Sequence, residues 1–387
     1  MFLNDSYDNM EYAANMSLWE NVSSIATSLT DVTSNNSTFE DPERSGFMKF
    51  SAVYEKAHGY ISVTVCIFGV ISNILNIFVL TRKHMISPTN YILTALAIFD
   101  MFTMTTYIPY ATYLYIFASP SQSSYHPYAW VLFIVIHNNF IITCHTIALW
   151  LTVSLAVFRY IFVCHHTQAP TLCNLARSKL TVLITVGINI LFCIPNYAQY
   201  VVSEMPPDGD HTSYWISQRD LPPIFFTITY WLFGVLMKVA PCTFLTILSA
   251  ILIHAMHKAE KRKARLHSQG SRATQESSST ESNRTTKMLI AVVLSVVITE
   301  LPQGILALIS GINQDFFSNV YVPLGDVMDI LVLINSAINF ILYCIMSQAF
   351  RKTFRTHIFN VCVNNVRNRT NKNGVTYSSI QTEVTQV

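Results

Sequence analysis

Seven long apolar blocks, separated by short polar segments, run through the chain between about residues 60 and 346. Each block is long enough to cross a hydrocarbon layer of roughly 30 Å as a single helix. The blocks cover approximately Tyr60–Leu80, Tyr91–Phe117, Ala129–Val163, Leu180–Val202, Ile224–Met256, Lys287–Gly311 and Val320–Met346. Alternating stretches of about ten residues, which would favour a transmembrane β-barrel, do not occur. The pattern predicts an all-α membrane protein with a seven-transmembrane helix bundle over residues 59–346.

Polar segments flank this bundle and interrupt it once. Residues 1–58 form a polar leader, residues 361–387 form a polar tail, and a segment at about 258–284 is charged and then rich in Ser and Thr. Segments with so little apolar surface to bury are expected to be disordered. Five N-glycosylation sequons occur in the leader, at Asn4, Asn15, Asn21, Asn35 and Asn36.

Positive charge is distributed unevenly between the two sides of the expected bundle. Most of the 24 Lys and Arg residues follow the first, third, fifth and seventh blocks. Because positive loops favour the cytoplasmic side, we expect the N-terminus outside and the C-terminus inside. None of the eight Cys residues lies in the leader or in an expected outer loop. The sequence therefore argues against an extracellular disulfide framework.

Composition argues against a soluble enzyme. Hydrophobic residues make up 51% of the chain and charged residues only 12%, about half of the charged share of an ordinary soluble domain. The catalytic motifs HExxH, GxSxG and the Walker loop do not occur. We expect neither an enzyme nor a cofactor, a metal centre or a nucleic-acid partner. One alternative is a zinc site formed by Cys164, Cys173 and the pair His165 and His166.

A few polar side chains fall inside the apolar blocks, where burial is costly and a function is the default expectation. One carboxylate and three amides are expected at similar depth in the bundle, namely Asp100, Asn73, Asn335 and Asn339. Together they are expected to form a hydrated polar core that binds Na⁺ and rearranges between two states. The alternative is a static hydrogen-bonded packing cluster. Four blocks are also interrupted by prolines that predict kinks, namely Pro109, Pro195, Pro241 and Pro302.

Short motifs at matching depths resemble the rhodopsin-like G-protein-coupled receptors over about residues 58–360. They are Asn73, Leu96–Asp100, Phe158–Tyr160, Pro241, Pro302 and Asn339–Tyr343. Strings such as Thr299–Gly304 and Asp329–Leu331 resemble one branch. It contains the sex peptide/myoinhibitory peptide receptors, the myosuppressin receptors and nematode receptors for FMRFamide-like peptides. Residues 347–360 are similar to the short amphipathic eighth helix of that family.

The chain also departs from the family pattern. Phe158 replaces the acid that usually precedes the arginine of the third block, and Glu300 replaces the usual Trp of the sixth. Both cysteines of the usual disulfide to the second outer loop are missing. Without an acid beside Arg159, we expect another restraint on the inactive state or appreciable basal activity.

The resemblance implies a plasma-membrane receptor for C-terminally amidated neuropeptides of the FMRFamide-like or myosuppressin type. The ligand would bind at the outer mouth, where Asp326 and Asp329 are spaced for a bidentate contact with an Arg. Glu300 lies deeper, and would bind the terminal amide or pair with Lys238. The expected aromatic walls are Tyr107, Tyr110, Tyr113, His145 and Tyr230, for which ordinary packing is the alternative.

At the inner face, the resemblance implies a heterotrimeric G protein, of the Gi/o type by resemblance alone, and arrestin. Tyr343 would move toward Arg159 on activation, and Tyr160 and Pro302 belong to the same machinery.

The tail suggests two further contacts. Cys362 is a palmitoylation candidate, and Thr385 and Val387 fit an ending that PDZ domains bind. Two alternatives for the whole protein stay open. One is a receptor for Trp-amide peptides of the myoinhibitory type, and the other is a ligand-independent membrane scaffold that binds PDZ proteins.

Overall fold

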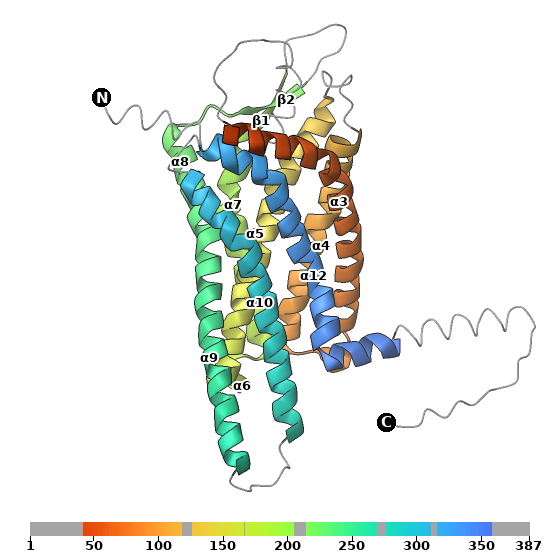
Figure 1. Ribbon diagram of the computed structural model, residues 1–387, viewed down its shortest axis with the longest axis vertical. Helices are drawn as coiled ribbons and strands as arrows, with labels where there is room; N and C mark the ends of the chain where they lie inside the picture. The colour runs from red at the N-terminus through yellow and green to blue at the C-terminus, as the bar shows by residue number, and fades with distance from the viewer. Residues whose placement is uncertain are drawn as a thin grey trace, which may run out of the picture.

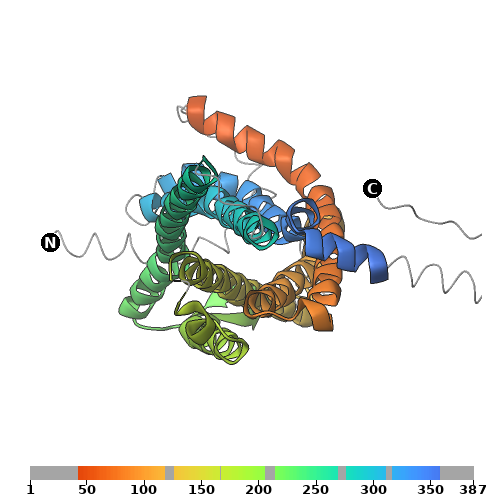
Figure 2. The same ribbon diagram turned by 90° about the horizontal axis from the view of Figure 1, so that it is seen from below.

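The computed structural model describes residues 42–117, 126–165, 167–204, 214–268, 276–310 and 316–357. Within these ranges, seven helices are long and apolar enough to cross a membrane. They run along the long axis of the molecule (Figure 1) and are arranged around a common centre when seen from below (Figure 2). The predicted all-α bundle is confirmed.

The long helices follow the order of the apolar blocks. Their bounds are α3 Pro42–Leu80, α4 Pro88–Ala111, α5 Tyr128–Cys164, α7 Leu175–Ala198, α9 Ala240–Ser268, α10 Glu276–Ser310 and α12 Gly325–Met346. Shorter helical segments lie between them: η2 Lys83–Met85, η3 Thr112–Phe117, α6 Ala169–Leu172, α8 Pro223–Trp231, η4 Leu232–Val239, η5 Phe317–Tyr321 and η6 Val322–Leu324.

Side-chain caps fix the start of two of these helices. The Ser87 hydroxyl accepts a hydrogen bond from the backbone N–H of Asn90 at 3.1 Å, at the start of α4. The Asn174 side chain accepts one from the N–H of Arg177 at 2.9 Å, at the start of α7. Each cap pairs a backbone donor that has no partner within its own helix.

The four interior prolines affect the backbone in two ways. Pro195 and Pro302 lie inside continuous α-helices. By contrast, Pro109 lies three residues before η3 begins, and Pro241 is the second residue of α9, just after η4 ends. Both η3 and η4 are π-helical, and such wider turns are frequent where a helix serves a functional site.

The two ends of the bundle differ in structure. Between α7 and α8, strands β1 (Tyr200–Glu204) and β2 (Tyr214–Gln218) pair as an antiparallel hairpin, and we call this the hairpin end. At the opposite end, which we call the tail end, a helix over residues 348–357 turns sideways from α12 (Figure 1). Phe350 and Thr353 of this helix are buried while Lys352 and Arg355 are exposed. This pattern agrees with the predicted amphipathic eighth helix.

Three boundaries differ from the sequence-based predictions. Helix α3 begins at Pro42, inside the leader predicted to be disordered. Helix α9 continues to Ser268 and α10 begins at Glu276, so both enter the segment predicted as a disordered loop. The predicted fourth block ended at Val202, which instead lies in β1. Hydropathy marks only the part of a helix that lies in apolar surroundings, so polar helix ends escape it.

Several predicted features lie outside the described residues. They are the five sequons of the leader, the palmitoylation candidate Cys362, and the C-terminal residues Thr385 and Val387.

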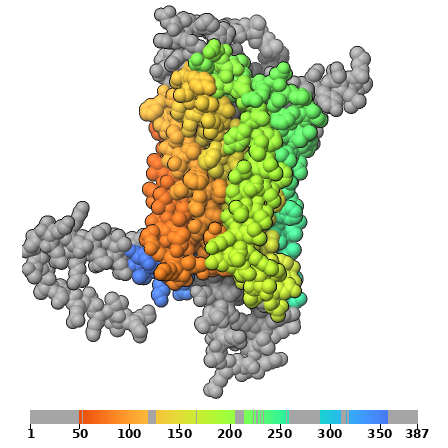
Figure 3. All heavy atoms as spheres, turned by 180° about the vertical axis from the view of Figure 1, so that it is seen from behind, coloured from red at the N-terminus to blue at the C-terminus, as the bar shows by residue number. Residues whose placement is uncertain are grey.

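The two largest clusters of buried apolar side chains lie toward opposite ends of the described bundle. The cluster toward the tail end includes Leu151, Tyr343 and Phe350, and the one toward the hairpin end includes Tyr107 and Leu333. Helix α7 contributes least to them, because only 17% of its apolar window is buried. It runs along one face of the molecule (Figure 3) and exposes apolar side chains suited to contact lipid.

Candidate functional site

Two carboxylates at the hairpin end of α12 form what we call the acid pair, Asp326 and Asp329. The Tyr115 hydroxyl donates to Asp326 Oδ1 at 2.8 Å, and the Tyr107 hydroxyl donates to Asp329 Oδ2 at 3.4 Å. Among the described residues, no Lys or Arg forms an ion pair with either carboxylate. Asp326 is only 9% exposed. Asp329 is half-buried. The acid pair is therefore partly sheltered from water and has no ion-pair partner among the described residues.

A histidine from α3 connects the two tyrosines that contact the acid pair. His58 is fully buried, its Nε2 is 3.0 Å from the Tyr107 hydroxyl, and its ring centroid is 4.7 Å from that of Tyr115. Sequence reasoning missed His58, because it placed this residue in the disordered leader. Its position just before an apolar block was the available signal.

Aromatic rings from α4, η3 and α5 pack together at the hairpin end. Tyr110 lies with its ring centroid 4.6 Å from that of His137, and Tyr113 lies 3.9 Å from Trp130. We call Tyr107, Tyr110, Tyr113, His137 and Trp130 the aromatic wall; sequence reasoning missed the last two, and a role of the wall in ligand binding stays a prediction. Tyr230 lies in α8, but its side chain is outside the described part of the structure.

The hairpin lies over this aromatic wall. Tyr200, Val202 and Ile216 of the two strands pack against the buried cluster of the hairpin end. Burial there raises the pKa of the Tyr200 hydroxyl, which consequently remains neutral. The sequence carries a signal for this hairpin: two runs of β-branched and aromatic residues flank Asp208 and Gly209, which are residue types that favour turns.

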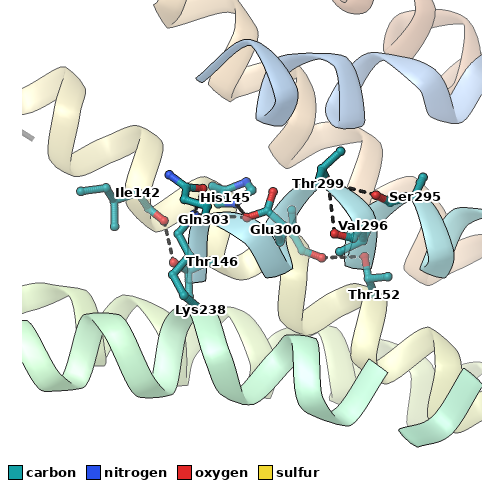
Figure 4. Close-up of polar contacts among 11 residues, drawn as sticks. Ile142, His145, Thr146, Thr152, Lys238, Ser295, Val296, Thr299, Glu300 and Gln303 are labelled. Atoms are coloured by element: carbon teal, nitrogen blue, oxygen red, sulfur yellow. Dashed lines mark hydrogen bonds and ion pairs between the residues drawn. The ribbon is translucent and has the colours of Figure 1, made fainter. Parts of the chain in front are cut away.

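Deeper in the bundle, three helical segments meet at an ion cluster composed of His145, Lys238 and Glu300 (Figure 4). Glu300 Oε2 is 3.0 Å from His145 Nε2 and 3.2 Å from Lys238 Nζ. Lys238 also donates to Gln303 Oε1 at 2.9 Å. The expected alternative for Glu300, an ion pair with Lys238, is therefore present. His145, expected in an aromatic wall, instead contacts Glu300 from α5.

The predicted polar core lies next to this ion cluster, toward the tail end. Asn339 Nδ2 donates to Asp100 Oδ2 at 3.0 Å, and Asn335 Oδ1 accepts from Ser295 at 3.3 Å. A small cavity between them has room for about one water molecule. Asn73 is not part of its lining and instead donates to backbone carbonyls. The carboxylate and amide oxygens that line this cavity are ligands that suit Na⁺. Sodium binding at this cavity stays a prediction.

At the tail end, Arg159 has no acidic partner among the described residues. Its guanidinium donates to Thr89 Oγ1 at 3.3 Å, and its Nε has no partner there. Tyr343 is buried against Phe350, with ring centroids 5.6 Å apart. Tyr160 instead lies at the edge of His165. The structure therefore holds Arg159 by one neutral hydrogen bond, as its Phe158 neighbour led us to expect.

The zinc alternative is not tested as a whole, because His166 lies outside the described residues. Among the described residues, no group of three or more His, Cys, Asp or Glu side chains is placed to bind a metal ion.

The described structure has the features of the seven-transmembrane G-protein-coupled receptors. They are seven apolar helices, a polar core at mid-depth, an arginine at one end, and a short sideways helix after the seventh span. The chain belongs to the family described as "Serpentine type 7TM GPCR chemoreceptor Srw", whose model matches residues 60–361. It is accordingly a multi-pass membrane protein of the rhodopsin-like neuropeptide receptors.

Relatives with assigned names agree with this class. The chain is 29% identical to the G-protein coupled receptor dmsr-1 of Caenorhabditis elegans, over 80% of this chain and 69% of that protein. It is 31% identical to the sex peptide receptor of Drosophila melanogaster, over 77% of this chain and 71% of that protein. A third relative, the FMRFamide receptor of the same fly, is 23% identical over 76% of this chain and 52% of its own length. All three are receptors rather than enzymes.

Proposed function

We propose that this protein is a plasma-membrane receptor for C-terminally amidated neuropeptides of the FMRFamide-like or myosuppressin type. The peptide binds at the hairpin end, and a heterotrimeric G protein binds at the tail end. One observation carries this proposal: two neighbouring carboxylates, one buried and one half-buried, accept hydrogen bonds from tyrosines and form no ion pair among the described residues. The name of one relative, the FMRFamide receptor, supports a peptide of this chemistry.

Charge distribution supports the orientation. The tail-end segments hold most of the Lys and Arg residues, and all five leader sequons precede α3. The hairpin end and the N-terminus then face outward, and the tail end faces the cytoplasm. Gi/o coupling and arrestin binding follow only from the resemblance to the family.

The ligand chemistry follows from the acid pair. A buried carboxylate without a cation is costly, so binding a cationic group at this position is favourable. Asp326 and Asp329 lie three residues apart on one helix, hence on one face. A guanidinium can donate to both carboxylates, whereas an ammonium group lacks that planar geometry. The peptide's Arg is therefore the group assigned to this pair.

Transmission through the bundle follows from the ion cluster. It joins α5, η4 and α10 at mid-depth, between the acid pair and Arg159. Since Arg159 has only a neutral partner, the ion cluster is the restraint on the inactive state that the sequence led us to expect. Movement of Tyr343 toward Arg159, with Pro302 as a hinge in α10, completes the proposed activation.

A cell assay tests the proposal. The full chain is expressed with a promiscuous G-protein reporter, and surface delivery is confirmed by an N-terminal tag on unpermeabilised cells. Matched amide and free-acid forms of FMRFamide, a myosuppressin and a Trp-amide peptide are applied. We expect a response to the Arg-containing amides at nanomolar to low micromolar concentration.

The same panel separates the alternatives. A response to the Trp-amide peptide alone would assign the receptor to the myoinhibitory type, which the 31% identity to the sex peptide receptor favours as second candidate. Silence across the panel with normal surface delivery would contradict the peptide proposal and leave the PDZ-binding scaffold.

A further inference from the structure

His137 of α5 is a buried polar side chain that nothing in the described structure satisfies. It is 2% exposed, and neither Nδ1 nor Nε2 has a hydrogen-bond partner among the described residues. Buried polar groups are nearly always paired, so an unpaired one needs an explanation. Leaving both ring nitrogens without partners destabilises the resting protein, and a ligand that supplies partners removes that cost.

Aromatic rings pack against the imidazole ring of His137, so a ligand would contact the edge of this ring. Phe133 stacks on it, with centroids 5.5 Å apart and planes 15° apart, and Tyr110 approaches to 4.6 Å with planes 31° apart. Both ring nitrogens lie on the edge of the imidazole, in its plane. A neutral imidazole presents one donor and one acceptor at that edge.

The position of His137 relates it to the acid pair. Tyr107 lies between them, because its hydroxyl donates to Asp329 while its ring centroid is 6.1 Å from that of His137. A peptide ending in Arg-Phe-amide has one residue between the Arg and the terminal carboxamide. Two extended residues span roughly 7 Å, comparable to the one aromatic ring that separates the two positions.

We propose that His137 binds the C-terminal carboxamide of the peptide and thereby selects amidated ligands over free acids. This inference rests on the proposed function. The N–H of the carboxamide donates to the unprotonated nitrogen of the imidazole. A free carboxylate has no N–H to donate, so this nitrogen would stay without a partner. The free acid would also bring a negative charge close to Asp326 and Asp329, which repel it.

The hairpin leaves this subsite accessible without breaking a covalent bond. The segment 199–223 contains no Cys. The described contacts of the strands with the bundle are noncovalent, and they include packing on the buried cluster and a hydrogen bond from the Tyr214 N–H to the His126 carbonyl at 3.0 Å. Displacing the hairpin would expose the aromatic wall to which His137 belongs.

The experiment compares three probes on the full-length receptor: FMRFamide, its free acid and its methyl ester. The ester is neutral like the amide but has no N–H donor, so it separates charge repulsion from hydrogen bonding. On the wild type we expect the potency order amide, ester, acid, with at least tenfold between amide and ester. In His137→Phe, which keeps the stacked ring but removes both nitrogens, amide and ester should become equipotent within about threefold.

Two variants control for packing. His137→Gln restores a donor and an acceptor and should recover part of the preference for the amide. His254→Phe, an exposed histidine of α9, should leave all three potencies unchanged. Surface delivery is measured for each variant. If His137→Phe fails to reach the surface, the wild-type order of the three probes decides the question.

The outcomes are distinguishable. A wild-type amide-to-ester ratio near one, or an unchanged ratio in surface-delivered His137→Phe, would overturn the role of His137 while the peptide receptor stands. An equal loss for all three probes would show that His137 only supports packing. Silence of the wild type toward every amidated peptide of the earlier panel would overturn both proposals.

Discussion

Glu300 and the acid pair, two sites that hold carboxylates inside the described bundle, differ in their partners. Glu300 has His145 and Lys238 within 3.2 Å of the same carboxylate oxygen, whereas the acid pair has only tyrosine hydroxyls. A buried carboxylate with its own cation is already compensated and connects the helices that supply its partners. A buried carboxylate without one favours an external cation. The contrast separates a site that holds the bundle together from a site prepared for a ligand.

The largest expected effect comes from removing the cation of Glu300. Lys238→Met should destabilise the receptor by about 3 kcal/mol, because it leaves the buried Glu300 carboxylate with His145 as its remaining partner. The measurement is the thermal unfolding midpoint of the purified protein. The double variant Lys238→Met/Glu300→Gln should recover much of the loss, and Lys179→Met, an exposed lysine of α7, should have little effect. A double variant less stable than Lys238→Met would contradict the compensated pair.

A somewhat smaller effect is expected at the acid pair, and on ligand potency rather than stability. Asp329→Asn should lower the potency of an Arg-containing amide by about 30-fold or more, since a charge-assisted contact is lost. The same peptide with citrulline in place of Arg should lose little between wild type and variant. The matched control is Asp220→Asn, an exposed acid that follows β2. Equal losses for the Arg and citrulline peptides would refute the assignment of the Arg to this pair.

Asp100 lies between these two extremes, because it accepts a hydrogen bond from the neutral Asn339 amide. If the polar core binds Na⁺, replacing K⁺ with Na⁺ should stabilise the wild type by about 1–2 kcal/mol. Asp100→Asn should remove this dependence. Thermal midpoints in matched Na⁺ and K⁺ buffers give the answer, and a salt response that persists in the variant would place the ion elsewhere.

The smallest expected effect concerns how the acid pair is oriented. Tyr115→Phe removes the hydrogen bond to Asp326 and should lower peptide potency only a few-fold, corresponding to about 1 kcal/mol. Tyr113→Phe is the control, because its ring packs on Trp130 without a described contact to the acid pair. Dose–response curves for both variants, corrected for surface delivery, make the comparison. A loss above tenfold for Tyr115→Phe would mean that the hydroxyl itself contacts the ligand.

The sequence was sufficient for the seven spans and for the unpaired Arg159, because each depends on long apolar runs or on adjacent residues. It also placed Glu300 and Lys238 at compatible depths. It could not choose between ligand contact and ion pair for Glu300, since that depends on how three helices are rotated about their axes. His58 was missed for a related reason. Its helix begins in polar sequence, where hydropathy carries no signal for an extended helix.

The hairpin is the feature with a kinetic consequence. Its described contacts with the bundle are noncovalent: the packing of three side chains, the Tyr214–Tyr128 ring contact and the hydrogen bond from the Tyr214 N–H to the His126 carbonyl. Opening is therefore a local event rather than one that breaks a covalent bond. Peptide association then includes an opening step, and its rate constant should lie below that of an electrostatically steered encounter with an open pocket. The residence time of a bound peptide should be longer for the same reason, because the peptide leaves only when the hairpin opens again.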